Sequence, residues 1–190
     1  MITNTGKSLQ KSSYSLFPHS LSGNILQVLF LMGLGMLAVV LHVHLRMPMK
    51  LPGRHGVEFM VLFMAGRVFS NYRYASSLSS LGASAIAFIP VWGFDNPFMP
   101  LTFLLPGIIM DFFYNFIRTD KFYFKLIILA LAGGLAYATI PVIRFFIMQT
   151  TGFPFNSLLL GPGFPILSHF LFGSVGAAFG YFIFGKIKKQ

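Results

Sequence analysis

The side chains that could do chemistry in this chain are few, and several are histidines. His42-x-His44, His55-x-x-Glu58 and the single His169 offer imidazole and carboxylate ligands of the kind that hold transition metals. Only the i, i+3 or i, i+4 spacing brings two ligands to one face of a helix, and side chains two residues apart diverge by about 200°. His42, His44, His55 and His169 therefore form a weak metal hypothesis, beside which interfacial or helix-capping histidines and direct ligand contacts stay open.

Arg144 is the most informative charged residue in the second half of the chain. Tyr137, Pro141 and Arg144 follow i, i+4 and i+7, which places a phenol, a proline-loosened turn and a guanidinium on one helical face. Such a face suits an anionic or aromatic ligand. The alternative is that Arg144 reaches the lipid headgroups from a helix end.

Further polar residues fall at the same predicted depth and extend this hypothesis to an outward-facing pocket. Ionisable groups at membrane depth are costly unless they pair or line a wet cavity. Glu58 could pair with Arg54 or His55 and still contact a ligand, and Trp92 would form an aromatic wall. The predicted substrate-binding residues are Arg54, His55, Glu58, Trp92, Asn96, Tyr137, Arg144 and His169.

A second polar group is predicted at the opposite, inner side. Asp111, Asn115 and Arg118 share one helical face at i, i+4 and i+7, and Arg67 is their expected partner from another helix. We expect a structural ion pair of Asp111 with Arg67 or Arg118. The open alternative is that Asp111, Arg67 and Arg118 contact a cytoplasmic partner or a coupling element.

The elements that must position these residues are set by an extreme composition. The chain has 190 residues, of which 55% are hydrophobic and only 9% charged, and it has no cysteine. Soluble domains carry roughly 25% charged residues, so the composition indicates a membrane protein. Its Lys and Arg residues are spread between apolar runs rather than clustered, which argues against a nucleic-acid partner.

Sequence motifs of enzymes are missing from the chain. There is no G-x-S-x-G, H-E-x-x-H, P-loop or G-x-G-x-x-G, and the lack of cysteine excludes a thiolate nucleophile or a disulfide framework. We therefore expect a protein that is not an enzyme and that needs no cofactor.

Six apolar runs predict an all-α membrane protein, a compact bundle of six transmembrane helices. The expected organisation is a cytoplasmic tail over 1–24, the transmembrane domain over 25–185 and a basic tail over 186–190. Small residues at four-residue spacing predict close helix contacts. The runs are 25–45, 57–69, 76–92, 98–117, 122–148 and 165–184, and the small-residue seams are Ser79/Ala83/Ala87, Ala130/Gly134/Ala138 and Gly176/Gly180.

The basic residues predict the orientation of these spans. With six spans, ten Lys and Arg fall on the side of the termini and four on the other, which places both termini in the cytoplasm. If the short second run were re-entrant, five spans would remain and every later loop would be inverted. The ten are Lys7, Lys11, Arg67, Arg73, Arg118, Lys121, Lys125, Lys186, Lys188 and Lys189, and the four are Arg46, Lys50, Arg54 and Arg144.

Three stretches carry a resemblance to a known family. They are Leu51-Pro-Gly-Arg-His-Gly-Val-Glu-Phe-Met60, Ala65-Gly-Arg67 and Leu104-Leu-Pro-Gly-Ile-Ile-Met-Asp111. They resemble the substrate-binding (S) subunits of energy-coupling factor transporters. The first helix departs from that pattern, since Gly33, Gly35 and Ala38 do not give the Ala-x-x-x-Ala seam common in such subunits.

The resemblance implies a multi-pass subunit of the bacterial cell membrane, surrounded by lipid, that captures a vitamin-like small molecule from outside. It also implies a transmembrane coupling protein with two ATP-hydrolysing subunits as partners, and a pocket covered by the loop over 46–56. Two other hypotheses remain open: a structural or assembly subunit of a larger membrane complex, and a histidine-based metal ion carrier.

Overall fold

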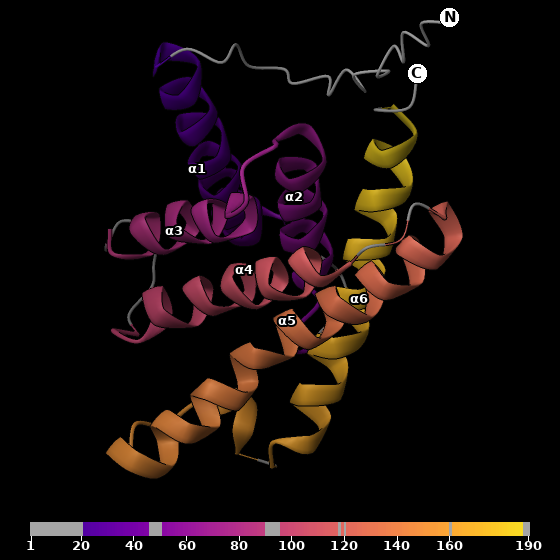
Figure 1. Ribbon diagram of the computed structural model, residues 1–190. Coiled ribbons are helices and arrows are strands. Elements are labelled where there is room, and N and C mark those ends of the chain that lie inside the picture. The colour runs from indigo at the N-terminus through magenta and orange to yellow at the C-terminus, as the bar shows by residue number, and fades with distance from the viewer. Residues whose placement is uncertain are drawn as a thin grey trace, which may run out of the picture.

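The structure, a computed structural model, describes residues 21–45, 51–89, 96–117, 119, 121–159 and 161–187, and over these residues it is all-helical. This confirms the predicted all-helical class, and the described residues form six α-helices. The elements are α1 (Leu21–His44), α2 (Gly56–Phe69), α3 (Ala75–Ala87), α4 (Met99–Phe116), α5 (Phe122–Thr151), the 3-10 helix η2 (Asn156–Leu158) and α6 (Gly163–Ile187) (Figure 1).

Four of these helices are long and apolar enough to cross a membrane. They are α1, α4, α5 and α6, whereas α2 has 14 residues and α3 has 13. At about 1.5 Å per residue, helices of that size extend roughly 20 Å, against a hydrocarbon layer of about 30 Å. Helix length and composition therefore support four of the six predicted spans.

Large apolar side chains face outward along the long helices. On α6, Leu171, Val175 and Phe179 lie one turn apart and are 54%, 57% and 55% exposed. In water, a continuous apolar stripe of this kind would be costly, whereas in a bilayer it meets lipid. The interior is aromatic, and Phe59, Phe63 and Phe103 are almost completely buried between α2 and α4.

Glycines allow the helices to approach at backbone distance. A Cβ on Gly35 of α1 would lie 1.6 Å from the Ser79 carbonyl oxygen of α3, and one on Gly176 of α6 would lie 2.6 Å from the Val57 carbonyl oxygen of α2. Side chains in the predicted small-residue seams therefore pack inside this chain. Close backbone contact of this kind is how helices associate in lipid, where dispersion replaces the hydrophobic effect.

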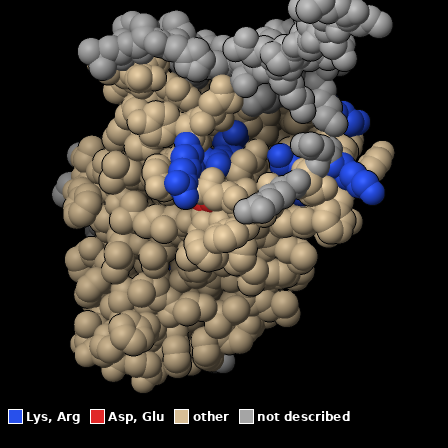
Figure 2. Space-filling model, viewed as in Figure 1, with Lys and Arg blue, Asp and Glu red and all other residues tan. Residues whose placement is uncertain are grey.

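Polar groups are concentrated at the two ends of the helices. The first turn of α1 and the last turn of α6 lie at the same end of the molecule, and on the face in Figure 2 the Lys and Arg side chains gather toward that end. On α5, Lys125 and Arg144 are separated by about 28 Å of helix. This spacing is close to the thickness of a hydrocarbon layer, so each residue can lie at one face of a membrane.

Candidate functional site

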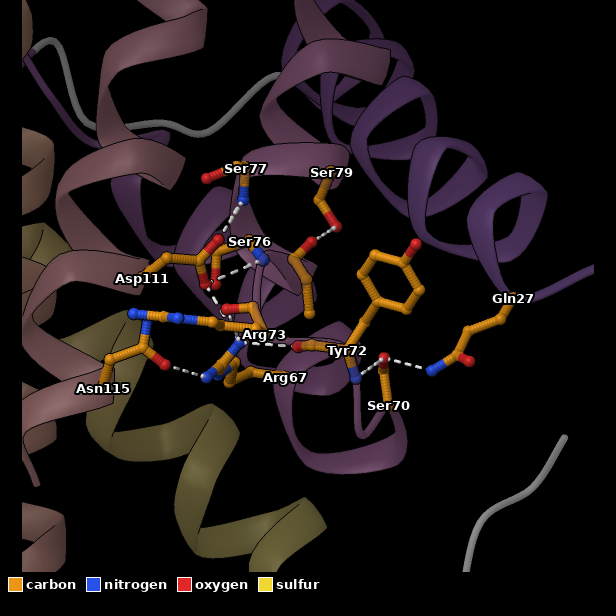
Figure 3. A network of polar contacts seen from close by, with 11 residues as sticks. Gln27, Arg67, Ser70, Tyr72, Arg73, Ser76, Ser77, Ser79, Asp111 and Asn115 are labelled. Atoms are coloured by element: carbon orange, nitrogen blue, oxygen red, sulfur yellow. Dashed lines mark hydrogen bonds and ion pairs between the residues drawn. The ribbon is translucent and has the colours of Figure 1, made fainter. Parts of the chain in front are cut away.

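One polar network lies where the C-terminal end of α2 meets α3 and α4 (Figure 3). The guanidinium of Arg67 donates to Asp111 at 3.2 Å, to Asn115 at 3.1 Å and to the carbonyl oxygens of Tyr72 and Arg73 at 2.8 and 2.7 Å. The same guanidinium lies 4.0 Å over the ring of Tyr114. The predicted pair of Asp111 with Arg67 is therefore present, while Arg118 lies outside the described residues.

Asp111 also caps the N-terminus of α3. Its carboxylate accepts the backbone N–H of Ser76 at 3.1 Å and that of Ser77 at 2.7 Å. Tyr74, which precedes α3, makes no side-chain capping bond of its own, so a residue from α4 satisfies N–H groups that a helix start otherwise leaves without acceptors. Asp111 is 2% exposed and Arg67 7% exposed, which makes this network a structural junction of three helices.

A second polar site surrounds a small cavity at the other end of α2. The cavity has a volume of about 110 Å³ and is lined by residues of α1, α4, α5 and α6, of the turn before α2 and of η2. At about 30 Å³ per water molecule it has room for three or four waters. Its lining residues are His42, Pro52, Gly53, His55, Phe103, Tyr137, Ile140, Arg144, Ser157 and His169.

The turn before α2 is shaped by glycines that press against two rings of the site. The rings of Tyr137 and His169 stack with their centroids 5.3 Å apart. Gly53 has φ +79° and a Cβ there would lie 2.7 Å from the His169 ring, while a Cβ on Gly56 would lie 2.6 Å from the Tyr137 ring. The stretch Leu51-Pro-Gly-Arg-His-Gly therefore forms one wall of the cavity only because glycine stands at both positions.

Three potential metal ligands lie close together beside this wall. One ligand atom from each of His42, His55 and Glu58 falls within 4.8 Å of the others. His55 Nδ1 is hydrogen-bonded to Glu58 Oε1, and His55 Nε2 accepts a hydrogen bond from Arg54 Nε at 3.2 Å. Both ring nitrogens of His55 are thus in use, one of them toward a cation.

Arg144 has unusual surroundings for a guanidinium. Its one hydrogen bond in the described part of the chain runs to the thioether sulfur of Met99 at 3.1 Å, and its Nε has no hydrogen-bond partner there. Thioethers are weak acceptors, and within that same part no carboxylate forms an ion pair with Arg144. A partly buried guanidinium with so few acceptors is electrostatically suited to an anion.

A larger hollow adjoins the cavity. It has a volume of about 480 Å³ and shares Pro52 and Ser157 with the cavity, which places the two side by side. Its lining combines apolar side chains from the turn before α2 and the start of α6 with Arg54 and residues of the 3-10 helix. The lining residues are Leu51, Pro52, Arg54, Asn156, Ser157, Gly161, Phe164 and Pro165.

The structure brings most of the predicted binding residues together. His55, Tyr137, Arg144 and His169 line the cavity, Glu58 is bonded to His55, and Arg54 lines the adjoining hollow. Asn96 does not line either space and instead accepts the N–H of Phe98 at the start of α4. Trp92 lies outside the described residues. Of the metal candidates, His44 is exposed and bonds the carbonyl of Val40, away from the cluster.

Several residues at the site have no sequence signal of their own. Phe103, which lines the cavity, and Met99, which is bonded to Arg144, resemble ordinary apolar helix residues in the sequence. Ser157 lies in η2, and no sequence motif marks it. No family model, curated protein or solved structure matches the chain.

Proposed function

We propose that this chain is a membrane-embedded capture subunit of an uptake transporter that binds a small, partly anionic molecule at Arg144. The observation that carries the proposal is the lack of any carboxylate paired with Arg144 in the described part of the chain, together with its place on a cavity. Charged groups buried in proteins are normally paired. A ligand that supplies the missing anion accounts for this arrangement.

The proposed topology has six spans, both termini in the cytoplasm and the cavity open to the outside of the cell membrane. Support comes from the position of the Arg67 network and the Arg144 cavity at opposite ends of the molecule, and from the excess of basic residues predicted on the side of the termini. On this proposal α2 and α3, the shorter helices, complete their crossings with the turns that flank them.

The proposed partners are the lipids around the bundle and a coupling protein with two ATPase subunits, as the resemblance to energy-coupling factor S subunits implies. The alternative role as an assembly subunit has less support. It needs small-residue seams free for other proteins, whereas Gly35, Gly134, Gly176 and Gly180 all pack against other helices of this chain.

Native mass spectrometry of the full chain, extracted gently from its membrane, tests the capture function. We expect a small molecule to accompany the purified protein and to be lost from Arg144→Ala, whose thermal unfolding stays close to that of the wild type. Arg73→Ala is the matched control, because Arg73 is an exposed arginine at the other end of α2. A protein that carries no small molecule, or an Arg144→Ala protein that keeps it, contradicts the proposal.

A further inference from the structure

We infer that the ligand is an amphiphilic organic acid, whose carboxylate lies in the cavity at Arg144 and whose apolar body lies in the adjoining hollow. This inference rests on the proposed capture function and adds the chemical class of the ligand. It follows from the volumes of the two spaces, the charges around them and the contacts that the histidine rings already make.

The volumes of the cavity and the hollow indicate how a ligand would divide between them. The inner cavity, at about 110 Å³, holds a head group of a few non-hydrogen atoms and no more. Pockets for whole small molecules measure roughly 300–1,000 Å³, and the adjoining hollow of about 480 Å³ falls in that range. A ligand that reaches Arg144 must therefore leave most of its volume in the hollow.

The side chains that line each space indicate which part of the ligand lies there. The hollow is lined by Leu51, Pro52, Phe164 and Pro165, and Phe164 is 61% exposed and free to cover an apolar ligand. The cavity presents the guanidinium of Arg144, a planar fork of N–H donors that matches a carboxylate. The two surfaces together fit a molecule that is apolar at one end and acidic at the other.

The charged side chains around the two spaces favour a ligand that carries one negative charge. Among the residues that the structure describes, Arg54 and Arg144 are the guanidinium groups that line the two spaces, and Glu58 is the carboxylate beside them. Two fixed positive charges and one negative charge leave a single net positive charge for the ligand to neutralise. A monocarboxylate does so, whereas a divalent cation would add to the excess.

The histidine cluster also favours an anion over a metal ion. A metal bound to His42, His55 and Glu58 would use the Nε2 of His55 or its Nδ1, and these already face Arg54 and Glu58. The rings form walls of the cavity instead: the centroid of the His42 ring lies 4.1 Å from that of the tilted His55 ring, and His42 meets Phe103 edge-on at 5.9 Å.

Isothermal titration of the full chain in detergent tests the inference with matched probes. Phenylacetate carries both parts of the ligand, phenylacetamide lacks the charge and acetate lacks the apolar body. We expect phenylacetate to bind at least about tenfold more tightly than either of the other two, because the charge-assisted hydrogen bonds and the apolar contact are each worth roughly that factor.

Binding to variants tests which residues contact the carboxylate of the ligand and which contact its apolar body. Arg144→Gln is expected to remove the preference for the acid over the amide, with Arg144→Lys in between, and Phe164→Ala to weaken phenylacetate but not acetate. Arg73→Gln, which removes a positive charge far from the site, is expected to change nothing. Glu58→Gln is expected to strengthen phenylacetate binding, because it removes a negative charge that repels the ligand while keeping an acceptor for His55.

The outcomes separate this inference from the proposed function. Equal binding of acid and amide, or a small neutral molecule in native mass spectra, overturns the acid and leaves capture standing. Stoichiometric Zn²⁺ binding that Glu58→Gln abolishes, with no acid bound, overturns it in favour of the metal site. Preferential binding of dioctanoyl phosphatidate assigns the site to a lipid headgroup and overturns it too. If no probe binds and no small molecule accompanies the protein, both the inference and the capture function fall.

Discussion

Asp111→Asn is the substitution for which the structure gives the clearest energetic expectation. The carboxylate is 2% exposed and accepts hydrogen bonds from Arg67, from the N–H of Ser76 and from that of Ser77. Asparagine has nearly the same shape but no charge and only one acceptor oxygen. It therefore leaves Arg67 buried without an anionic partner and at least one N–H of α3 without an acceptor.

The cost follows from the burial of both partners. Removing one partner of a buried ion pair costs about 3–5 kcal/mol, because the remaining charge stays uncompensated. Asn115→Ala is the internal comparison: it also removes a side chain bonded to Arg67, at 3.1 Å, but Asn115 is neutral and exposed. Its loss should cost about 1 kcal/mol, the net value of an ordinary hydrogen bond.

The assay is unfolding of the detergent-solubilised full chain by titration with SDS, with helicity as the signal. Arg67→Met and the double variant Arg67→Met/Asp111→Asn complete a cycle, in which the double variant should lose less stability than the two single variants together, by about 0.5–3 kcal/mol. If Asp111→Asn costs no more than Asn115→Ala, or if the cycle is additive, the ion pair does not join the three helices.

Two further predictions concern packing and orientation. Gly35→Ala should destabilise the protein by about 1–3 kcal/mol in the same titration, because its Cβ would meet the backbone of α3. Gly33→Ala should be nearly neutral, because a Cβ on Gly33 would have nothing within 4 Å. Equal effects of the two substitutions would refute the close contact. Since the chain has no cysteine, a single introduced cysteine reports on which side of the membrane its position lies. Asn156→Cys should react with an impermeant maleimide from outside intact cells, and Arg73→Cys should react only after permeabilisation. The reverse pattern would support five spans.

Much of the fold was predictable because apolar runs determine helices in a membrane protein. The runs over 98–117 and 122–148 became α4 and α5 almost unchanged. The run over 76–92 is the least well matched, since α3 ends at Ala87 and residues 90–95 lie outside the described part. Hydropathy sets the existence of a helix, but its length depends on the turns at its ends.

Sequence spacing predicted the site only where its residues share one helix. Tyr137 and Arg144 were expected on one face and both line the cavity, and His42 and His44 were expected to diverge and do so. The contact of Gly53 with His169 joins residues far apart in the chain, so no local pattern could predict it. The capping of α3 by Asp111 could not be predicted from local sequence either, although a helix start without a local cap indicates that another element supplies one.

An experimental structure of the gently purified full chain tests most directly whether the Arg144 cavity receives an anionic ligand. We predict density for a non-protein group within hydrogen-bond distance of the Arg144 guanidinium, continuous into the hollow lined by Phe164 and absent from Arg144→Ala. A cavity that holds only water, or a metal ion at His42 and His55, would show that Arg144 binds no anion there.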